Sequence, residues 1–277
     1  MLSTDFQFFA PTALDEALAL LHEHQDGGKV LSGGMSMMPA INLGVLRPTA
    51  IVSLNHVPGL DGLEDAGDHL RIGGLVRHHV VQSDPLVRAH APLLAQAASV
   101  IADVQVRHRG TIGGSVAHAD PSADYLPVLV ALDATVELAS ASGTRDVRAR
   151  EFFVDVMMTA LALDEIVVGL RVPKVPAEGG SAYVRLARVE GSFAIACAAA
   201  VAVGDRVSLG VGGAVPTPVH LDVTCDGSEA SLDAAAEAAF QACEDAYGDL
   251  NGSAEYRRAM ARVYARRAIQ QALAARG

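Results

Sequence analysis

Cysteine, tryptophan and positive charge are all scarce in this chain of 277 residues. The three cysteines, Cys197, Cys225 and Cys243, form no Cys-x-x-Cys pair, which excludes an iron–sulfur cluster held by this chain alone and disfavours a disulfide framework. The formal net charge of −11 argues against a nucleic-acid partner, because a phosphate-binding surface needs a basic excess. No stretch approaches twenty uncharged apolar residues, and the first residues lack the basic and apolar segments of a signal peptide. We therefore expect a cytoplasmic protein without a membrane span.

Apolar residues are abundant, at 51%, against 19% charged residues, which is typical of a globular protein with a core. The length favours one large or two modest domains. Breaker residues concentrate in the run 173–180, between two regular regions, so this run is the best candidate linker. We predict one domain over 1–176, with possible subdomains 1–57 and 58–176, and a second domain over 177–277.

The periodicity of apolar residues predicts an α+β fold. Leu14, Leu18 and Leu21 share one face of a helix that Thr12 caps and Gly27-Gly28 ends, and short apolar runs at 29–31 and 50–54 complete a small parallel βαβ unit. A mixed or antiparallel sheet follows, with strands near 69–76, 135–138 and 166–172 and a helical stretch over 85–104. The C-terminal part reads as an antiparallel sheet (181–188, 193–203 and 206–214) followed by helices at 231–246 and 254–275.

Two glycine-rich turns carry flanking hydroxyl groups, at Ser32–Ser36 and at Thr111–Ser115. Adjacent glycines permit positive φ angles and let backbone N–H groups approach an anion without interference from a Cβ atom. Two such turns that face each other can clamp a pyrophosphate. Neither matches the phosphate-binding lysine loop or the G-x-G-x-x-G pattern. Ordinary tight turns remain the alternative, because the chain has other Gly-Gly pairs, such as Gly179-Gly180.

The stretch 106–124, with Arg109-Gly110-Thr111-Ile112-Gly113-Gly114-Ser115 at its centre, closely resembles a signature of the FAD-binding, or medium, subunits of molybdenum hydroxylases. This family includes the carbon monoxide dehydrogenase medium subunits and the flavin domain of xanthine dehydrogenase. Residues 31–39 resemble the family's first pyrophosphate loop, and residues 126–134 also follow the family pattern. The resemblance extends over essentially the whole chain.

The resemblance implies an electron-transfer role. FAD, bound non-covalently, would pass electrons from [2Fe-2S] clusters of a small subunit to an external acceptor, while a large subunit would hold the molybdopterin. A dimer of such heterotrimers is the expected assembly. No catalytic side chain and no metal ligand are expected in this chain, because the flavin carries the chemistry. A free-standing FAD-dependent oxidase or dehydrogenase, and a non-catalytic nucleotide-binding protein, remain alternatives. The substrate and the acceptor (NAD, oxygen or a quinone) stay open.

The resemblance also implies the residues that contact the cofactor. The two loops would hold the pyrophosphate, Asp124 would accept hydrogen bonds from FAD, and Arg185 occupies the basic position of the family's Tyr-x-Lys. Phe193 would lie beside the isoalloxazine. The full set is Val30, Leu31, Ser32, Gly33, Gly34, Met35, Ser36, Met37, Ile101, Gly110, Thr111, Ile112, Gly113, Gly114, Ser115, Ala117, Asp120, Asp124, Val168, Arg185 and Phe193.

Three further groups of residues are expected to be structural. The histidines His56, His78, His79 and His90 fit no zinc spacing and are expected to be solvated. The arginines of the last helix (Arg257, Arg258, Arg262, Arg266 and Arg267) are expected to form a solvated basic face. Finally, Gly180 lies in the linker region, so a bulky replacement there should be tolerated.

Overall fold

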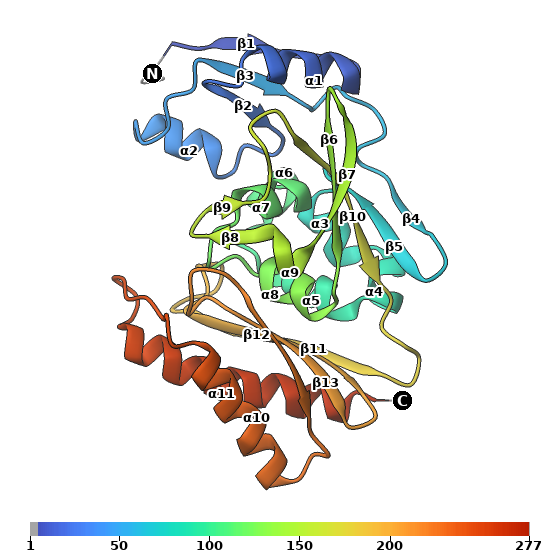
Figure 1. The fold of residues 1–277 in the computed structure, drawn as a ribbon, viewed down its shortest axis with the longest axis vertical. Coiled ribbons are helices and arrows are strands. Elements are labelled where there is room, and N and C mark those ends of the chain that lie inside the picture. Colours follow the sequence, from blue (N-terminus) through green and yellow to red (C-terminus); the bar gives the residue numbers. More distant parts are fainter. Residues whose placement is uncertain (1–4, 277) are drawn as a thin grey trace.

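Three main β-sheets follow one another along the long axis of the molecule, each accompanied by helices, and a small two-stranded sheet lies beside the central one (Figure 1). The computed structural model describes residues 5–276; the first four residues, on which the expectation about a signal peptide partly rests, lie outside the described part. Within that part, no helix is long and apolar enough to cross a lipid bilayer. The α+β class expected from the sequence is confirmed.

The N-terminal unit is a parallel three-stranded sheet with the strand order β1-β3-β2. Parallel neighbours need crossover connections, which here are helices. Leu18 and Leu21 are the buried face of the first helix, as their spacing predicts. The helix begins after Ala13, however, and not at a cap formed by Thr12. The elements are β1 (Gln7–Phe9), α1 (Leu14–Glu23), β2 (Gly28–Leu31), α2 (Met37–Asn42) and β3 (Ala50–Ser53).

The central unit combines an antiparallel five-stranded sheet, in the order β4-β5-β10-β6-β7, with a group of short helices. Its strands are β4 (Leu63–Asp65), β5 (His69–Gly73), β6 (Thr135–Ser140), β7 (Gly143–Arg148) and β10 (Ile166–Pro173), with the separate hairpin β8 (Phe153–Asp155) and β9 (Met158–Thr159). Its helices are α3 (His78–Ser83), α4 (Pro85–His90), α5 (Pro92–Val100), α6 (Val104–Arg109), α7 (Ile112–His118), α8 (Tyr125–Ala131) and α9 (Ala149–Phe152).

The C-terminal unit is an antiparallel four-stranded sheet, in the order β11-β12-β13-β14, covered by two helices. Its elements are β11 (Gly180–Leu186), β12 (Ala196–Val203), β13 (Arg206–Gly212), β14 (Val219–Thr224), α10 (Glu229–Ala242) and α11 (Ala254–Ala274). Helices α5 and α8 lie between this sheet and the central one, and α10 and α11 cover its outer face (Figure 1). Strand β12 is therefore buried on both faces: Cys197 and Ala199 join the central core, and Ala198 and Ala200 join the core under α10 and α11.

Short elements and proline account for several departures of the structure from the periodicity. The expected helical stretch over 85–104 is divided, because Pro92 starts a new helix after Ala91, which is not helical. Strands β1, β4, β7, β8, β9 and β14 were not anticipated; several have only two or three residues, too few to display an alternating pattern.

Two expectations about charged and titratable side chains are wrong. Arg257 is 1% exposed, and it donates hydrogen bonds to the carbonyl oxygens of Ile195 (2.9 Å) and Gly213 (2.5 Å). It also pairs with Asp249 at 2.6 Å and stacks on the ring of Tyr247. The start of α11 is thus tied to the ends of β12 and β13. Helix amphipathicity could not reveal this, because the backbone groups that bind Arg257 lie far away in sequence.

His78 is buried as well, and its Nδ1 atom lies 3.0 Å from the Tyr125 hydroxyl. Burial lowers the pKa of His78 to about 4, and the nearby positive charge of Arg77 acts in the same direction. The imidazole is therefore neutral in the folded protein at physiological pH. His79 stacks on His108 with ring centroids 4.0 Å apart, so it too differs from a freely solvated histidine.

We predict that Arg257→Met lowers the free energy of unfolding by about 3 kcal/mol, because two buried carbonyl groups lose their donor and Asp249 loses its partner. Chemical denaturation measures this difference. The control is Arg267→Met on the same helix, whose exposed guanidinium stacks on Tyr264 and should contribute about 0.5 kcal/mol. Equal effects of the two substitutions would contradict a structural role for Arg257.

We also predict a pH-dependent contribution from His78. Its pKa is lowered from 6.5 to about 4, so between these values the unfolded chain binds a proton that the folded chain does not. The stabilisation is complete above pH 6.5 and is lost as the pH falls toward 4, by about 2 kcal/mol between pH 6.5 and about pH 5. His78→Gln lacks this loss of stability at low pH. The difference in unfolding free energy between the wild type and His78→Gln should therefore be smaller by about this amount at about pH 5 than at about pH 7.5. The exposed His56→Gln serves as control, and a gap for His78→Gln that does not narrow would refute the prediction.

Candidate functional site

The first glycine-rich loop, residues 32–36, leaves β2 at the carboxyl end of the parallel N-terminal sheet. Gly34 has a φ of +74°, a conformation that L side chains rarely adopt, so glycine is required there. No backbone N–H of residues 32–36 donates a hydrogen bond to another group in the described chain. Met35 and Ser36 are exposed. The loop thus presents a row of backbone donors without internal partners, as an anion requires.

The second glycine-rich segment is the start of a helix and not the tight turn that its sequence indicates. Thr111 caps α7, and its hydroxyl accepts a hydrogen bond from Gly114 N–H at 3.1 Å. The N–H groups of Ile112 and Gly113 donate to the carbonyl groups of Val76 and Gly74. The backbone donors of this segment are therefore mostly used inside the protein. The Ser115 hydroxyl and the Thr111 N–H have no partner among the described residues.

Glycine is needed in both segments because they touch each other. The hydroxyl groups of Ser32 and Thr111 lie 3.1 Å apart. A Cβ atom on Gly33 would come within 2.7 Å of Gly110 Cα, and one on Gly114 would come within 2.7 Å of Ser32 Oγ. These distances are shorter than real Cβ contacts. A side chain at Gly33 would push the two segments apart, because it meets backbone atoms, and one at Gly114 would displace the Ser32 hydroxyl from Thr111. The structure therefore brings together the two loops that the sequence singled out.

A hydrogen-bonded bridge that the sequence analysis missed joins the same two loops. Asn55 donates to the carbonyl oxygen of Ser32 at 3.1 Å, and its side-chain oxygen accepts from Arg77 at 3.0 Å. Arg77 donates in turn to the carbonyl oxygen of Arg109. A signal for Asn55 existed: it follows β3 as Ser32 follows β2, and parallel neighbours end at the same edge of a sheet. Arg77 carries no comparable signal.

Positive charge gathers around the second loop although the chain as a whole is acidic. Arg77, Arg107 and Arg109 all belong to this region, and Arg107 donates to the carbonyl oxygens of Ile101 and Ala102. Burial lowers the pKa of Arg77, and the nearby positive charge of Arg109 lowers it further. The two guanidinium groups are therefore close enough for their positive potentials to add. Unpaired N–H donors in a cationic surrounding suit a phosphate or pyrophosphate group. The two loops therefore fit the pyrophosphate of FAD.

Asp124 and Arg185, both expected to contact the cofactor, form an ion pair with each other. The Arg185 guanidinium lies 3.0 Å from Asp124 Oδ1 and 3.2 Å from Oδ2, and the Tyr183 hydroxyl donates to Oδ1 at 2.5 Å. Asp124 is 5% exposed. Burial raises the pKa of its carboxyl group, against the opposing effects of Arg185 and Tyr183. Tyr183 was not among the expected site residues, although the Tyr-x-Arg pattern contained it.

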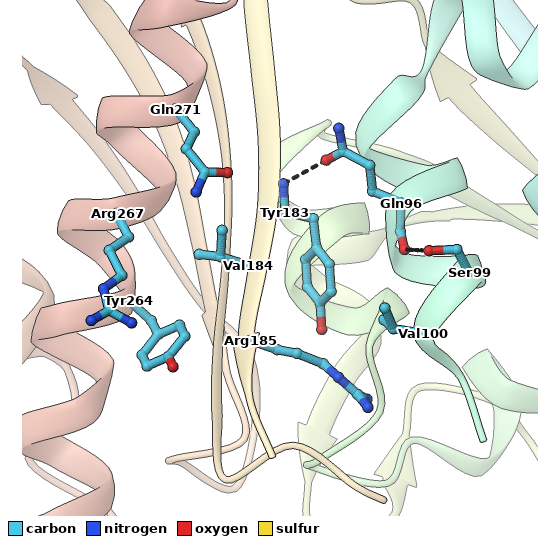
Figure 2. A pocket seen from close by; sticks show the side chains of 9 residues that line it. All are labelled: Gln96, Ser99, Val100, Tyr183, Val184, Arg185, Tyr264, Arg267 and Gln271. Atoms are coloured by element: carbon cyan, nitrogen blue, oxygen red, sulfur yellow. Dashed lines mark hydrogen bonds between the residues drawn. The ribbon is translucent and has the colours of Figure 1, made fainter. Parts of the chain in front are cut away.

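A hollow of about 420 Å³ opens beside Arg185, between α5, β11 and α11. Figure 2 shows Tyr183 and Arg185 pointing from β11 toward α5, and Val184 pointing the opposite way toward α11. This alternation is that of a β-strand, and it places Arg185 at the junction between the central helices and the C-terminal sheet.

The remaining expected residues lie on several elements. Val30 and Leu31 end β2, Met37 begins α2, and Ala117 lies on α7. Ile101 follows α5 directly, and Val168 on β10 accepts a hydrogen bond from Gly74, the residue that packs against Gly113. Asp120 caps its own turn through Ser122 N–H. Phe193 is 61% exposed in the segment between β11 and β12. Within residues 5–276, no three His, Cys, Asp or Glu side chains are arranged to hold a metal ion.

Sequence comparison places the whole chain among known proteins. Residues 4–175 match the profile described as FAD binding domain in molybdopterin dehydrogenase, and residues 181–272 match the CO dehydrogenase flavoprotein C-terminal domain. The nicotine 6-hydroxylase medium subunit of Paenarthrobacter nicotinovorans is 37% identical, with 96% of each chain aligned. The carbon monoxide dehydrogenase medium chain of Hydrogenophaga pseudoflava is 36% identical, with 99% of each chain aligned.

Solved structures agree with this result. A chain of the carbon monoxide dehydrogenase from Hydrogenophaga pseudoflava, in a form lacking the Mo-pyranopterin moiety of its cofactor, superposes with a TM-score of 0.95 over 100% of both chains, at 36% identity. A chain of quinoline 2-oxidoreductase from Pseudomonas putida 86 superposes with a TM-score of 0.86 over 98% of both chains, at 28% identity. The loops that meet at Ser32 and Thr111 lie inside the matched FAD-binding domain. The chain therefore belongs to the family of FAD-binding medium subunits of molybdopterin dehydrogenases, and it is an oxidoreductase component.

Proposed function

We propose that this chain is the electron-transfer subunit of a heterotrimeric molybdenum hydroxylase. It would receive electrons from iron–sulfur clusters of a small subunit, in an assembly whose large subunit holds the molybdopterin, and pass them to an external acceptor. We further propose that two heterotrimers associate, that the assembly works in the cytoplasm, and that this chain folds as two domains that meet after residue 176. The names of the relatives support the partners, because these relatives are medium subunits of larger enzymes.

The observation that carries the proposal is the contact between the two glycine-rich loops. They meet at Ser32 and Thr111, and Gly33 and Gly114 leave no room for a side chain between them. The unpaired N–H groups of residues 32–36 would donate to the pyrophosphate of FAD, and the hydroxyl group of Ser115 would add a donor from the second loop. The surrounding arginines would balance the charge of the pyrophosphate.

The other residues would orient the cofactor and keep water from it. When bound, FAD accepts and releases electrons singly or in pairs, and the protein supplies position and electrostatics. Arg185 and Asp124 would offer a cation and an acceptor at a shared, buried point, while Ile101 and Val168 would supply apolar surface. Neither glycine-rich loop contains a cysteine or histidine that could bond covalently to the flavin, which supports non-covalent binding.

We predict that Gly114→Val reduces FAD occupancy at least tenfold, because the new side chain would separate Ser32 from Thr111. Occupancy is measured from the flavin absorbance that acid precipitation releases into the supernatant. Yellow colour that remains in the pellet would contradict non-covalent binding. Unchanged occupancy in Gly114→Val would remove the second loop from the cofactor site.

The control for this substitution is Gly62→Val. Nothing lies within 4 Å of a Cβ atom at Gly62, and its φ is not positive, so the substitution should leave occupancy unchanged. Gly180 cannot serve as control, and the expectation that it tolerates a bulky residue is wrong. A Cβ atom there would overlap the carbonyl oxygen of Ala272, because α11 packs directly on β11.

We predict that the chain by itself does not oxidise the physiological substrate. Its three cysteines are scattered and buried, so it cannot ligate an iron–sulfur cluster, and the two matched domains span 4–175 and 181–272. The test is to assay candidate substrates with an artificial acceptor, first with the FAD-loaded chain and then with the co-encoded subunits added. Turnover only in the complete mixture is the expected result. Full turnover by the single chain would overturn the subunit proposal and favour a free-standing flavoenzyme.

A further inference from the structure

Tyr183 occupies a fixed position at the edge of the C-terminal sheet. Among the described strands, its own strand, β11, pairs with β12 alone, so the other edge of β11 has no strand partner in that part of the chain. At this edge the backbone N–H of Tyr183 donates to Gln96 Oε1 of α5 at 2.8 Å (Figure 2). The residue is therefore anchored through its backbone to α5, and its 8% exposure leaves the ring little room to move.

The hydroxyl group of Tyr183 is directed at the carboxylate that the proposed flavin site uses. It donates to Asp124 Oδ1 at 2.5 Å, and Arg185 donates to the same oxygen at 3.0 Å. The second oxygen, Oδ2, accepts from Arg185 at the longer distance of 3.2 Å, and no side chain of another described residue donates to it; the N–H of Asp124 itself also lies close to the carboxylate. A carboxylate oxygen can accept about two hydrogen bonds. Oδ1 is thus saturated, whereas Oδ2 keeps capacity for one more donor.

We propose that Tyr183 is a positioning residue of this site: by fixing Oδ1 it holds the Asp124 carboxylate in the single orientation in which Oδ2 can accept a hydrogen bond from the cofactor. The inference rests on the proposed flavin-binding function. Arg185 alone cannot impose this orientation, because its contacts to both oxygens persist when the carboxylate rotates slightly between them. Two donors on one oxygen remove that freedom.

The charge state of Asp124 depends on the same contact. The titratable and charged groups that face Asp124 are Arg185 and Tyr183 on β11, Cys197 on β12 and Tyr125 on α8. Burial raises the pKa of Asp124, and the Arg185 charge and the Tyr183 hydroxyl lower it. Burial also raises the pKa of Cys197 to about 12 and that of Tyr125 well above its usual value, so both stay neutral. Loss of the Tyr183 hydroxyl would therefore let Asp124 take up a proton at a higher pH.

The principal test is Tyr183→Phe in the full-length chain, purified with its co-purifying subunits. The dissociation constant of FAD, measured by quenching of flavin fluorescence, should rise about tenfold, as expected for the loss of a hydrogen bond to a charged group. FAD affinity should also be measured against pH. The fall in affinity on the acidic side of this profile, called here the acid limb, should lie at higher pH in Tyr183→Phe than in the wild type. In an Asp124→Asn background, Tyr183→Phe should cause no further loss, because the hydroxyl acts through the carboxylate.

The matched control is Tyr125→Phe, which removes another buried hydroxyl group. That hydroxyl lies 3.0 Å from His78 Nδ1, and its removal leaves the hydrogen bonds from Tyr183 and Arg185 to Asp124 in place. Its cost in thermal stability should resemble that of Tyr183→Phe, while the acid limb stays where it is in the wild type. If Tyr183→Phe does not fold, Gln96→Leu replaces it, since it releases the backbone anchor of Tyr183 and should shift the acid limb in the same direction.

The outcomes separate the two proposals. If the wild type binds FAD and Gly114→Val does not, but Tyr183→Phe has wild-type affinity and an unshifted acid limb, the positioning role is refuted and the flavin site stands. Additive losses in the double variant with Asp124→Asn also refute it. If the wild type binds no FAD, the proposed function and the inference that rests on it both fail. A shifted acid limb that disappears in Asp124→Asn supports both.

Discussion

The close approach of two loops is the constraint on which the remainder of this structure depends. Residues 32–36 come from the end of a parallel sheet and residues 110–115 from the start of α7, and their hydroxyl groups meet at 3.1 Å. Gly33 and Gly114 permit that distance because a Cβ atom at either position would collide with the other loop. Asn55 and Arg77 then fix the approach by bonding to the backbone of both sides. The N-terminal and central units are thereby held together at the edge where we propose that the pyrophosphate binds.

Buried polar contacts play the corresponding part between the central and C-terminal units. Arg257 ties α11 to the ends of β12 and β13, and the stacked Tyr247 places its hydroxyl 3.0 Å from that of Ser122, in the segment that leads to Asp124. Asp124, Tyr183 and Arg185 join the same two units from the other direction. Each of these side chains has hydrogen-bond partners, which lowers the cost of burying it, although the Nε atom of Arg257 has none among the described residues.

The two loops offer different hydrogen-bond donors, although their similar sequences indicate a symmetric clamp. The second segment uses most of its N–H groups inside the protein: Ile112 and Gly113 donate to the carbonyl groups of Val76 and Gly74, and Gly114 and Ser115 donate to Thr111 at the start of α7. Gly113 serves close packing, because a Cβ atom there would overlap the backbone of Gly74. The first segment keeps its N–H groups unpaired within the described chain. An anion between them would therefore take most backbone donors from residues 32–36 and mainly hydroxyl and guanidinium groups from the other side.

The sequence by itself determined the family, the α+β class, the βαβ unit and the two loops, because these depend on local residue patterns: Gly-Gly with flanking hydroxyls, leucines at helical spacing and the long motif at 106–124. Only the tertiary structure decided the hydrogen-bond partners of Arg77, Arg257 and Tyr183, the burial of His78 and the intolerance at Gly180. Each of these depends on a partner far away in the chain, such as Ile195 for Arg257 or Ala272 for Gly180. Periodicity and composition report on neighbours along the sequence, whereas burial and hydrogen bonding are set by how the three sheets and their helices stack.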